Sequence, residues 1–156
     1  MSQVKKVLFV CTGNICRSPA GEGVLQALLV EKGLDRDVLV DSAGTDDYHI
    51  GERADPRMRE AASDRGFHLG SRARQVETED FYDFDLVVAM DRGHLERMST
   101  LMGGRPENLF LFSDFLSDGP VDVPDPYYGG RRGFEEVLDL MEEGCPVLLD
   151  HLLEGG

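Results

Sequence analysis

The segment CTGNICRS, residues 11–18, combines groups that could bind and attack a phosphate. Five residues separate Cys11 from Arg17, so a loop could leave a strand, curl, and present the arginine beside the thiol at a helix N-terminus. The inward backbone N–H groups and the positive end of the helix dipole would then bind a dianionic oxyanion. The same positive surroundings stabilise the thiolate, which is the nucleophilic form of cysteine.

The neighbouring residues suit the same chemistry. Arg17 stays charged, and its planar guanidinium can hold two equatorial phosphate oxygens. Ser18 could cap the following helix, or its hydroxyl could bond the Cys11 thiolate and stabilise it as a leaving group. Gly13 and Asn14 tolerate the left-handed backbone that such a loop requires. A C-x5-R pattern alone is weak, and its position between a buried strand and a helix strengthens it.

Phosphoryl transfer through cysteine also needs an acid for the departing alcohol and a base for water. The long segment 113–131 contains three prolines and three glycines, and a loop of this length in a compact domain is usually functional. Asp125 lies between two prolines there, and the following proline holds it extended. Tyr127 and Tyr128 could form an aromatic wall for a flat substrate. Asp125 is therefore the candidate acid.

The elements that must position these residues alternate between strands and helices. This order predicts a doubly wound α/β fold, with a parallel sheet, helices on both faces and ligands at the carboxyl ends of the strands. Ser18 and Pro19 predict the N-cap and first position of a helix that ends at Gly33, and Gly144 and Pro146 should kink or split the last helix. We expect strands at 4–10, 38–40, 85–90 and 108–112, and further helices at 55–65, 92–102 and 132–153.

Length and charge limit the classes of function. The 156 residues suit one domain, residues 1–156, with a sizeable core. The chain has 30 acidic and 16 basic residues and a net charge of −14, which disfavours nucleic acid and anionic membranes as partners. The apolar run before Cys11 is far below the roughly 20 residues of a membrane span and has no cleavage site after it. We expect a cytoplasmic protein.

Cysteine and histidine patterns predict neither disulfides nor a metal centre. The three cysteines are an odd number without a secretory signal, which indicates reduced thiols. Alone, Cys16 is more typical of a small buried apolar residue. The sequence has no C-x-x-C or H-E-x-x-H pattern, so we expect no metal and no cofactor. We assign no role to the four histidines, which are His49, His68, His94 and His151.

Four motifs together resemble one family. CTGNICRSP at 11–19, DSAGT at 41–45, ARQ at 73–75 and DPYYG at 125–129 are similar to the low-molecular-weight protein tyrosine phosphatases, in the same order and over essentially the whole chain. The resemblance implies a four-stranded parallel sheet with helices on both faces. It also implies hydrolysis of phosphotyrosine in proteins, and of other aryl phosphates, through a cysteinyl-phosphate. We expect the protein to act as a monomer.

The resemblance also assigns roles to residues. It implies that Cys11 is the nucleophile, Asp125 the general acid, and Cys16 the thiol that traps an oxidised Cys11 as a reversible disulfide. Ser71 stands where some members have a histidine. In the same family pattern Arg17 and the loop amides of Thr12, Gly13, Asn14, Ile15 and Cys16 bind phosphate, Ser18 supports the thiolate, Ser42 bonds to Asn14, and Tyr48, Tyr127 and Tyr128 line the substrate cleft.

Several alternatives remain. Arginine phosphatases of the family resemble CTGNTCRSP, with threonine in place of Ile15, and tend to lack the double tyrosine, so this chain favours phosphotyrosine. Arsenate reductases of similar fold use two extra resolving cysteines, whereas only Cys145 remains here. A redox sensor, or a phosphate-binding module without turnover, is the non-enzymatic alternative. The complete set of Cys11, Arg17, Ser18 and Asp125 argues against lost turnover.

Overall fold

Four parallel strands form the centre of the computed structural model, which describes residues 4–154. They are β1 (Lys5–Cys11), β2 (Val38–Gly44), β3 (Leu86–Ala89) and β4 (Leu109–Leu111), in the order β2-β1-β3-β4. The first strand therefore lies between the second and the third. This order confirms the predicted four-stranded parallel sheet, and β2 continues through residues 41–44, beyond its predicted end.

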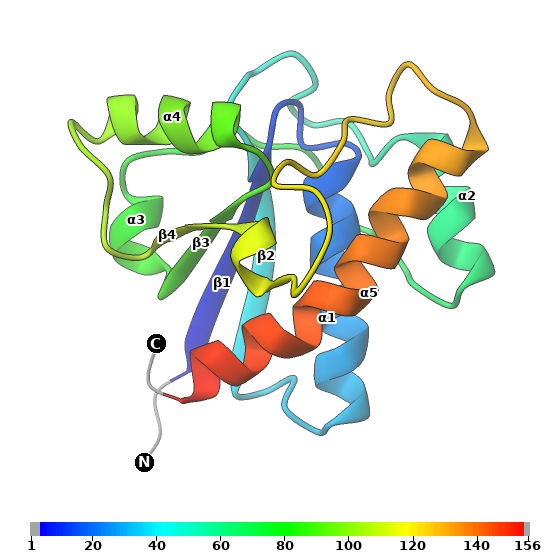
Figure 1. Ribbon diagram of the computed structural model, residues 1–156, viewed down its shortest axis with the longest axis horizontal. Helices are drawn as coiled ribbons and strands as arrows, with labels where there is room; N and C mark the ends of the chain where they lie inside the picture. The colour runs from blue at the N-terminus through cyan, green and yellow to red at the C-terminus, as the bar shows by residue number, and fades with distance from the viewer. Residues whose placement is uncertain (1–3, 155–156) are drawn as a thin grey trace.

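Helices cover both faces of the sheet, as predicted (Figure 1). One face carries α1 (Arg17–Glu31), α2 (Pro56–Asp64) and α5 (Arg131–Leu153), and the other carries α3 (Asp80–Asp83) and α4 (Arg92–Leu101). A short 3-10 helix, Phe112–Phe115, follows β4. Within the described residues, none of these helices combines the length and apolar character needed to cross a membrane.

The side chains of β1 point alternately to the two faces of the sheet and so belong to two different parts of the hydrophobic core. Val7 and Phe9 belong to the cluster beneath α1 and α5, whereas Leu8 and Val10 belong to the cluster that includes Met98 of α4. Each of the four β1 residues is fully buried. A strand buried on both faces reads as a continuous apolar run, which explains the segment before Cys11.

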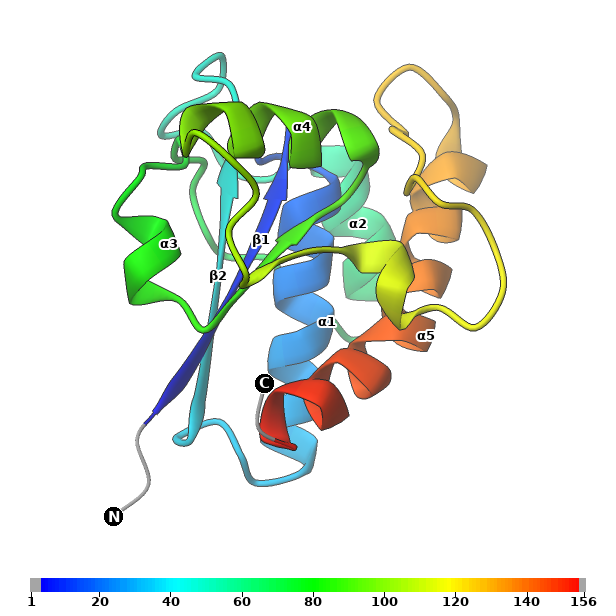
Figure 2. The same cartoon turned by 60° about the vertical axis from the view of Figure 1, so that its left-hand side comes forward.

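The register brings the carboxyl ends of three strands to one edge of the sheet. Cys11 is the last residue of β1 and pairs with Gly44 of β2, while Val10 pairs with Ala89 of β3. Figure 2 shows these ends at the same edge, next to α4. Loops that follow β1, β2 and β3 therefore meet beside Cys11, as expected for ligand sites of such sheets.

The start of α1 differs from the prediction. The helix begins at Arg17 with Cys16 as N-cap, so the assignment of Ser18 as N-cap is wrong. Ser18 lies inside the first turn, and its hydroxyl contacts Cys11 and Asn14 instead. Pro19 is also in the first turn, where the missing N–H costs no intrahelical hydrogen bond.

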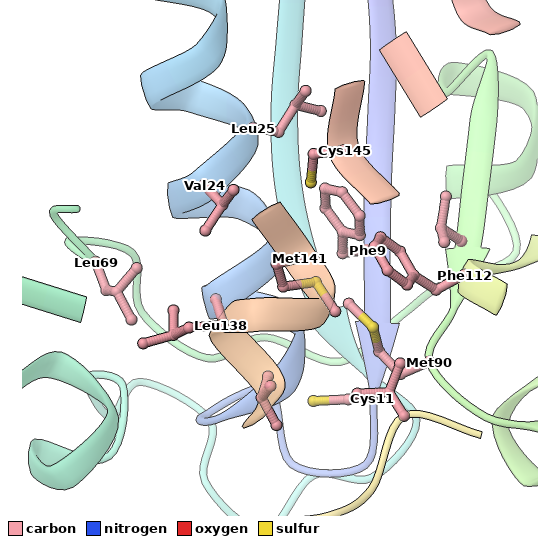
Figure 3. Close-up of a cluster of buried hydrophobic side chains, with 14 of the residues drawn as sticks. Phe9, Cys11, Val24, Leu25, Leu69, Met90, Phe112, Leu138, Met141 and Cys145 are labelled. Atoms are coloured by element: carbon pink, nitrogen blue, oxygen red, sulfur yellow. The ribbon is translucent and has the colours of Figure 1, made fainter. Parts of the chain in front are cut away.

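The last helix is not split at Gly144 or Pro146, because α5 runs as one element from Arg131 to Leu153 with Pro146 inside it. Pro146 is exposed, so the carbonyl that loses its partner can bond to water. Buried residues on both sides of this position, Met141 and Leu148 among them, hold the two halves against the core. Figure 3 shows Met141 and Cys145 of α5 beside Phe9 and Phe112.

Gly144 permits close approach of α5 to the 3-10 helix. A Cβ built at Gly144 would lie 2.3 Å from Cζ of Phe112, and Phe112 is fully buried. Real side chains do not approach so closely, so the phenyl ring or the helix would have to move.

We expect Gly144→Ala to lower the free energy of unfolding by about 1 kcal/mol, measured by urea denaturation. Alanine gains about 1 kcal/mol of helix propensity, but overpacking a filled core costs about 1–3 kcal/mol. Val147→Ala in the same helix, at an exposed position, should change stability by less than about 0.5 kcal/mol. An unchanged or higher stability of Gly144→Ala would contradict the packing argument.

Candidate active site

Residues 12–16 form a loop between β1 and α1 whose carbonyl groups face away from its concave side. The carbonyls of Cys11 and Thr12 accept hydrogen bonds from the segment after β2, and the Ile15 carbonyl accepts one from Asp55 N (2.8 Å). The opposite, N–H side of these peptide groups is thereby directed inward. Gly44 makes the arrangement possible, because a Cβ there would lie 2.6 Å from the Thr12 oxygen.

Asn14 fixes the shape of the loop, as expected. Among residues 4–154 it is the only non-glycine residue with positive φ, at 58°. Its Nδ2 donates to Ser18 Oγ (2.8 Å) and its Oδ1 accepts from the backbone N of Arg74 (3.0 Å). Arg74 is itself held by two bonds of 3.1 Å to Asp80 and one of 3.2 Å to Asp41.

Ser42 does not bond to Asn14, so this part of the expected network is wrong. Its Oγ donates to the carboxylate of Glu22 on α1. The register that pairs Ser42 with Phe9 explains this, because it turns the Ser42 side chain toward the α1 face of the sheet. Burial raises the pKa of the Glu22 carboxyl above its ordinary value.

Cys11 is buried, with its Sγ 3.0 Å from the hydroxyl oxygen of Ser18. Because Asn14 already donates to that hydroxyl, the proton of Ser18 is available for the sulfur, with the Ala43 carbonyl at 3.3 Å as the other acceptor. Such a hydrogen bond stabilises the thiolate. Burial and the charge of Asp55 raise the pKa of the Cys16 thiol above its ordinary value.

Arg17 is only 3 % exposed and is held by several partners. Nη1 donates to Asp91 Oδ2 (2.9 Å) and to the carbonyl of Val123 (3.0 Å). Nη2 lies 3.6 Å from Asp125 Oδ2. Asp125 accepts from the backbone N of Tyr127 (3.0 Å) and keeps a side chain that is 46 % exposed. Val123 and Asp125 of the long loop are thus both held at the arginine, and Tyr127 is bonded to Asp125.

A cleft of about 260 Å³ opens above this loop. Its walls include the tyrosines predicted to form it, and Tyr127 and Tyr128 meet edge to face with ring centroids 5.0 Å apart. Asn14 and Ser18 are fully or almost fully buried and do not line it. The lining residues are Thr12, Gly13, Ile15, Cys16, Arg17, Tyr48, His49, Asp125, Tyr127 and Tyr128.

Two residues next to Arg17 were not anticipated from the sequence, and one of them is a histidine to which no role was assigned. Asp91 forms the ion pair with Arg17, His94 Nε2 lies 2.7 Å from Thr12 Oγ1, and His49 lines the cleft. The sequence held a signal for the first pair. Asp91 directly follows a strand, as the Cys11 loop does, and its spacing from His94 is that of a capping box.

Comparisons with known proteins agree with this arrangement. The family model described as low molecular weight phosphotyrosine protein phosphatase matches residues 6–155. A putative low molecular weight protein-tyrosine-phosphatase from Synechocystis is 44% identical over 150 residues, 94% of this chain and 96% of the relative. The crystal structure of a protein tyrosine phosphatase from Entamoeba histolytica with Hepes in the active site has a TM-score of 0.91 and 41% identity, covering 97% of this chain and 98% of that one.

A third neighbour is the crystal structure of a Drosophila arginine phosphatase, with a TM-score of 0.85 and 33% identity over 94% of this chain and 96% of that one. The chain belongs to the low molecular weight phosphotyrosine protein phosphatase family. It is accordingly a hydrolase with the activity of a protein-tyrosine phosphatase, which confirms the function expected from the motifs.

The two hydrogen bonds of Asn14 give a test of the loop. Asn14→Gly keeps the positive φ accessible but removes both bonds, so we expect kcat/KM for p-nitrophenyl phosphate to fall about tenfold or more. Asn14→Ala should fall further, because alanine disfavours that backbone region. Asn108→Ala is the matched control, since Asn108 donates two bonds to Phe81 and Phe84 carbonyls. Full activity of Asn14→Gly would mean that the backbone alone shapes the loop.

Proposed function

We propose that this phosphatase hydrolyses phosphotyrosine in proteins, and other aryl phosphates, through a cysteinyl-phosphate formed on Cys11. The observation that carries the proposal is that Arg17 and Asp125 line one cleft, while Cys11, which is buried and does not line it, directly precedes the loop of residues 12–16 beneath it. Cys11 lies at the end of β1, Arg17 opens the next helix, and Asp125 lies 3.6 Å from Arg17 Nη2. A nucleophile, an anion-binding cation and an acid are the groups that such a reaction requires.

In the first step the phosphate dianion binds to the N–H groups of the loop and to Arg17. The Cys11 thiolate attacks phosphorus, the S–P bond forms, and the bond from phosphorus to the phenolic oxygen breaks. Asp125, in its protonated form, gives its proton to that oxygen, so the phenol leaves neutral. The exposed side chain of Asp125 allows it to reach a leaving group at the mouth of the cleft.

In the second step Asp125, now ionised, accepts a proton from the water molecule that attacks phosphorus. The S–P bond breaks and releases the Cys11 thiolate and inorganic phosphate. Ser18 supports this step, because its hydroxyl lies 3.0 Å from the sulfur and can donate to the returning negative charge. A hydrogen-bonded thiolate is a better leaving group than an isolated one.

The walls of the cleft support a preference for aryl phosphates. Tyr48, Tyr127 and Tyr128 offer ring surfaces on which a phenyl group can pack. Ile15 also lines the cleft and has no hydroxyl group that could orient an attack on a P–N bond. This favours phosphotyrosine over phosphoarginine, although a Drosophila arginine phosphatase has a similar fold.

Cys16 has the position of a protective thiol. We propose that it attacks the sulfenic acid that peroxide forms on Cys11, releasing water and leaving a disulfide that cellular thiols reduce. The free state of all three cysteines supports a reducing cytoplasm as the place of action.

Asp125→Asn tests the acid. We expect kcat for phenyl phosphate, which has a poor leaving group, to fall about 100-fold, and kcat for an activated ester such as 2,4-dinitrophenyl phosphate to fall far less. Asp118→Asn, at an exposed position of the same loop, should change neither rate. Equal losses on both esters would remove Asp125 as the acid.

Initial rates on peptides of one sequence carrying phosphotyrosine, phosphoserine or phosphoarginine test the substrate class. We expect phosphotyrosine to be turned over fastest, because only its ring can fill the aromatic part of the cleft. Cys11→Ser should abolish turnover of all three peptides while inorganic phosphate still binds. A preference for phosphoarginine would overturn the substrate, and turnover by Cys11→Ser would overturn the nucleophile.

A further inference from the structure

We propose that His94, in the first turn of α4, is a positioning residue whose neutral imidazole holds the Thr12 hydroxyl against Arg17. Thr12 is the first residue of the loop 12–16, which we call the phosphate loop. The proposal rests on the phosphate-binding role proposed above for Arg17. It assigns a function to a residue that does not line the cleft and that lies far along the chain from the loop it supports.

The contacts of His94 lead from α4 directly to the phosphate loop. The side chain is 5 % exposed, and its Nε2 lies 2.7 Å from Thr12 Oγ1 and 3.4 Å from Arg17 Nη2. Arg17 Nη2 lies 3.4 Å from the same Thr12 oxygen. The three side chains therefore form one closed group, with the Thr12 hydroxyl between two nitrogens.

The position of the imidazole proton follows from the N-cap of α4. The backbone N–H of Asp91 donates to Nδ1 of His94 (3.2 Å), while Asp91 Oδ1 accepts from the backbone N of His94 (2.9 Å). Nδ1 also lies 3.2 Å from Asp91 Oδ1. Because the backbone N–H of Asp91 is directed at Nδ1 and that carboxylate oxygen already accepts from the backbone N of His94, we assign the proton of the neutral ring to Nε2. His94 donates that proton to Thr12 Oγ1, and Arg17 Nη2 donates to the same oxygen.

The charges around the imidazole favour its neutral form. Arg17 faces it from α1, Asp91 from the N-cap of α4, Asp125 from the long loop and Asp46 from the segment after β2. Burial and the Arg17 cation lower the pKa of His94 to about 4, against the opposing effect of the three carboxylates. A protonated ring would place a second cation beside Arg17 and compete with it for Asp91.

This arrangement determines what Thr12 offers to the cleft. A hydroxyl has two acceptor lone pairs and one proton, and His94 and Arg17 occupy both lone pairs of Thr12 Oγ1. The remaining O–H must point elsewhere, and Thr12 lines the cleft. His94 therefore makes the Thr12 hydroxyl a donor for an oxygen of the bound phosphate. It also keeps the Arg17 guanidinium in place beside Thr12.

Two substitutions of His94 separate this role from helix capping. His94→Asn keeps an acceptor near the position of Nδ1, and so the cap of α4, but has nothing at the position of Nε2. His94→Gln can bring an amide N–H to Thr12. We expect His94→Asn to raise the KM for p-nitrophenyl phosphate and the inhibition constant of inorganic phosphate about tenfold, with a smaller change in kcat, and His94→Gln to restore part of the loss.

Three measurements complete the test. His68→Gln, an exposed histidine, should leave all constants unchanged, and His94→Asn and Thr12→Val should have effects that are not additive, because both remove one contact. In the nitrogen-15 NMR spectrum of the wild-type protein, His94 should be the neutral Nε2–H tautomer at neutral pH. The proposal would be overturned if a folded His94→Asn variant had the phosphate inhibition constant of the wild type, or if the effects of His94→Asn and Thr12→Val were additive. It would also be overturned if the imidazole of His94 were cationic or carried its proton on Nδ1.

The inhibition constant of inorganic phosphate reports binding and not a chemical step, so its change can be distinguished from the outcomes of the Cys11 and Asp125 experiments. If His94→Asn does not fold, the NMR spectrum of the wild-type protein and the constants of His94→Gln decide the question. Gln constants near those of the wild type with the predicted tautomer would support the proposal, and the opposite tautomer would reject it.

Discussion

A buried guanidinium is the constraint on which the site depends. Arg17 is 3 % exposed, and a charge removed from water is costly unless charged and hydrogen-bonding partners replace the solvent. Asp91 at the end of β3 supplies the opposite charge, and the Val123 carbonyl supplies a further acceptor. The position of the arginine thus requires that α1, the end of β3 and the long loop all meet at one point.

The order of the strands makes that meeting possible. Because β1 lies between β2 and β3, the loop after Cys11 has the segment after β2 on one side and Asp91 on the other. The β2 side holds the loop carbonyls and leaves room at Gly44, whereas the β3 side holds the arginine. The contacts that shape the backbone of the loop and the ion pair that balances the charge of Arg17 therefore lie on opposite sides of β1. Each can form without distorting the other.

Much of the fold and the central chemistry could be predicted from sequence, because their signals are local. The Cys11 to Arg17 spacing, the buried run of β1 and the prolines around Asp125 each lie within a few residues. Features set by contacts between distant segments were missed. Residues 41–44 extend β2 although they are polar or small, and α5 passes through Pro146 because burial on both sides holds it together.

The direction of individual side chains was the second feature that could not be predicted from the sequence. Ser42 was expected to bond to Asn14, yet the pairing of β2 with β1 turns it toward Glu22. His94 looked like an ordinary surface histidine until α4 brought it to within 2.7 Å of Thr12. Ser18 was expected as the N-cap, but the helix begins at Arg17, two residues before its predicted first position at Pro19. A single amino-acid sequence contains little information about such side-chain orientations.

The aromatic wall is joined to the floor of the cleft by a short rigid segment. The backbone N of Asp55 bonds to the Ile15 carbonyl, and the Asp55 carboxylate bonds to Arg57, whose guanidinium lies 5.2 Å from the ring centroid of Tyr127 and 4.9 Å from that of Phe134. Three consecutive residues, 55–57, therefore connect the loop after Cys11 with the wall of the cleft at Tyr127. A change at Asp55 would thus alter the loop and the aromatic wall together, although Asp55 itself does not line the cleft.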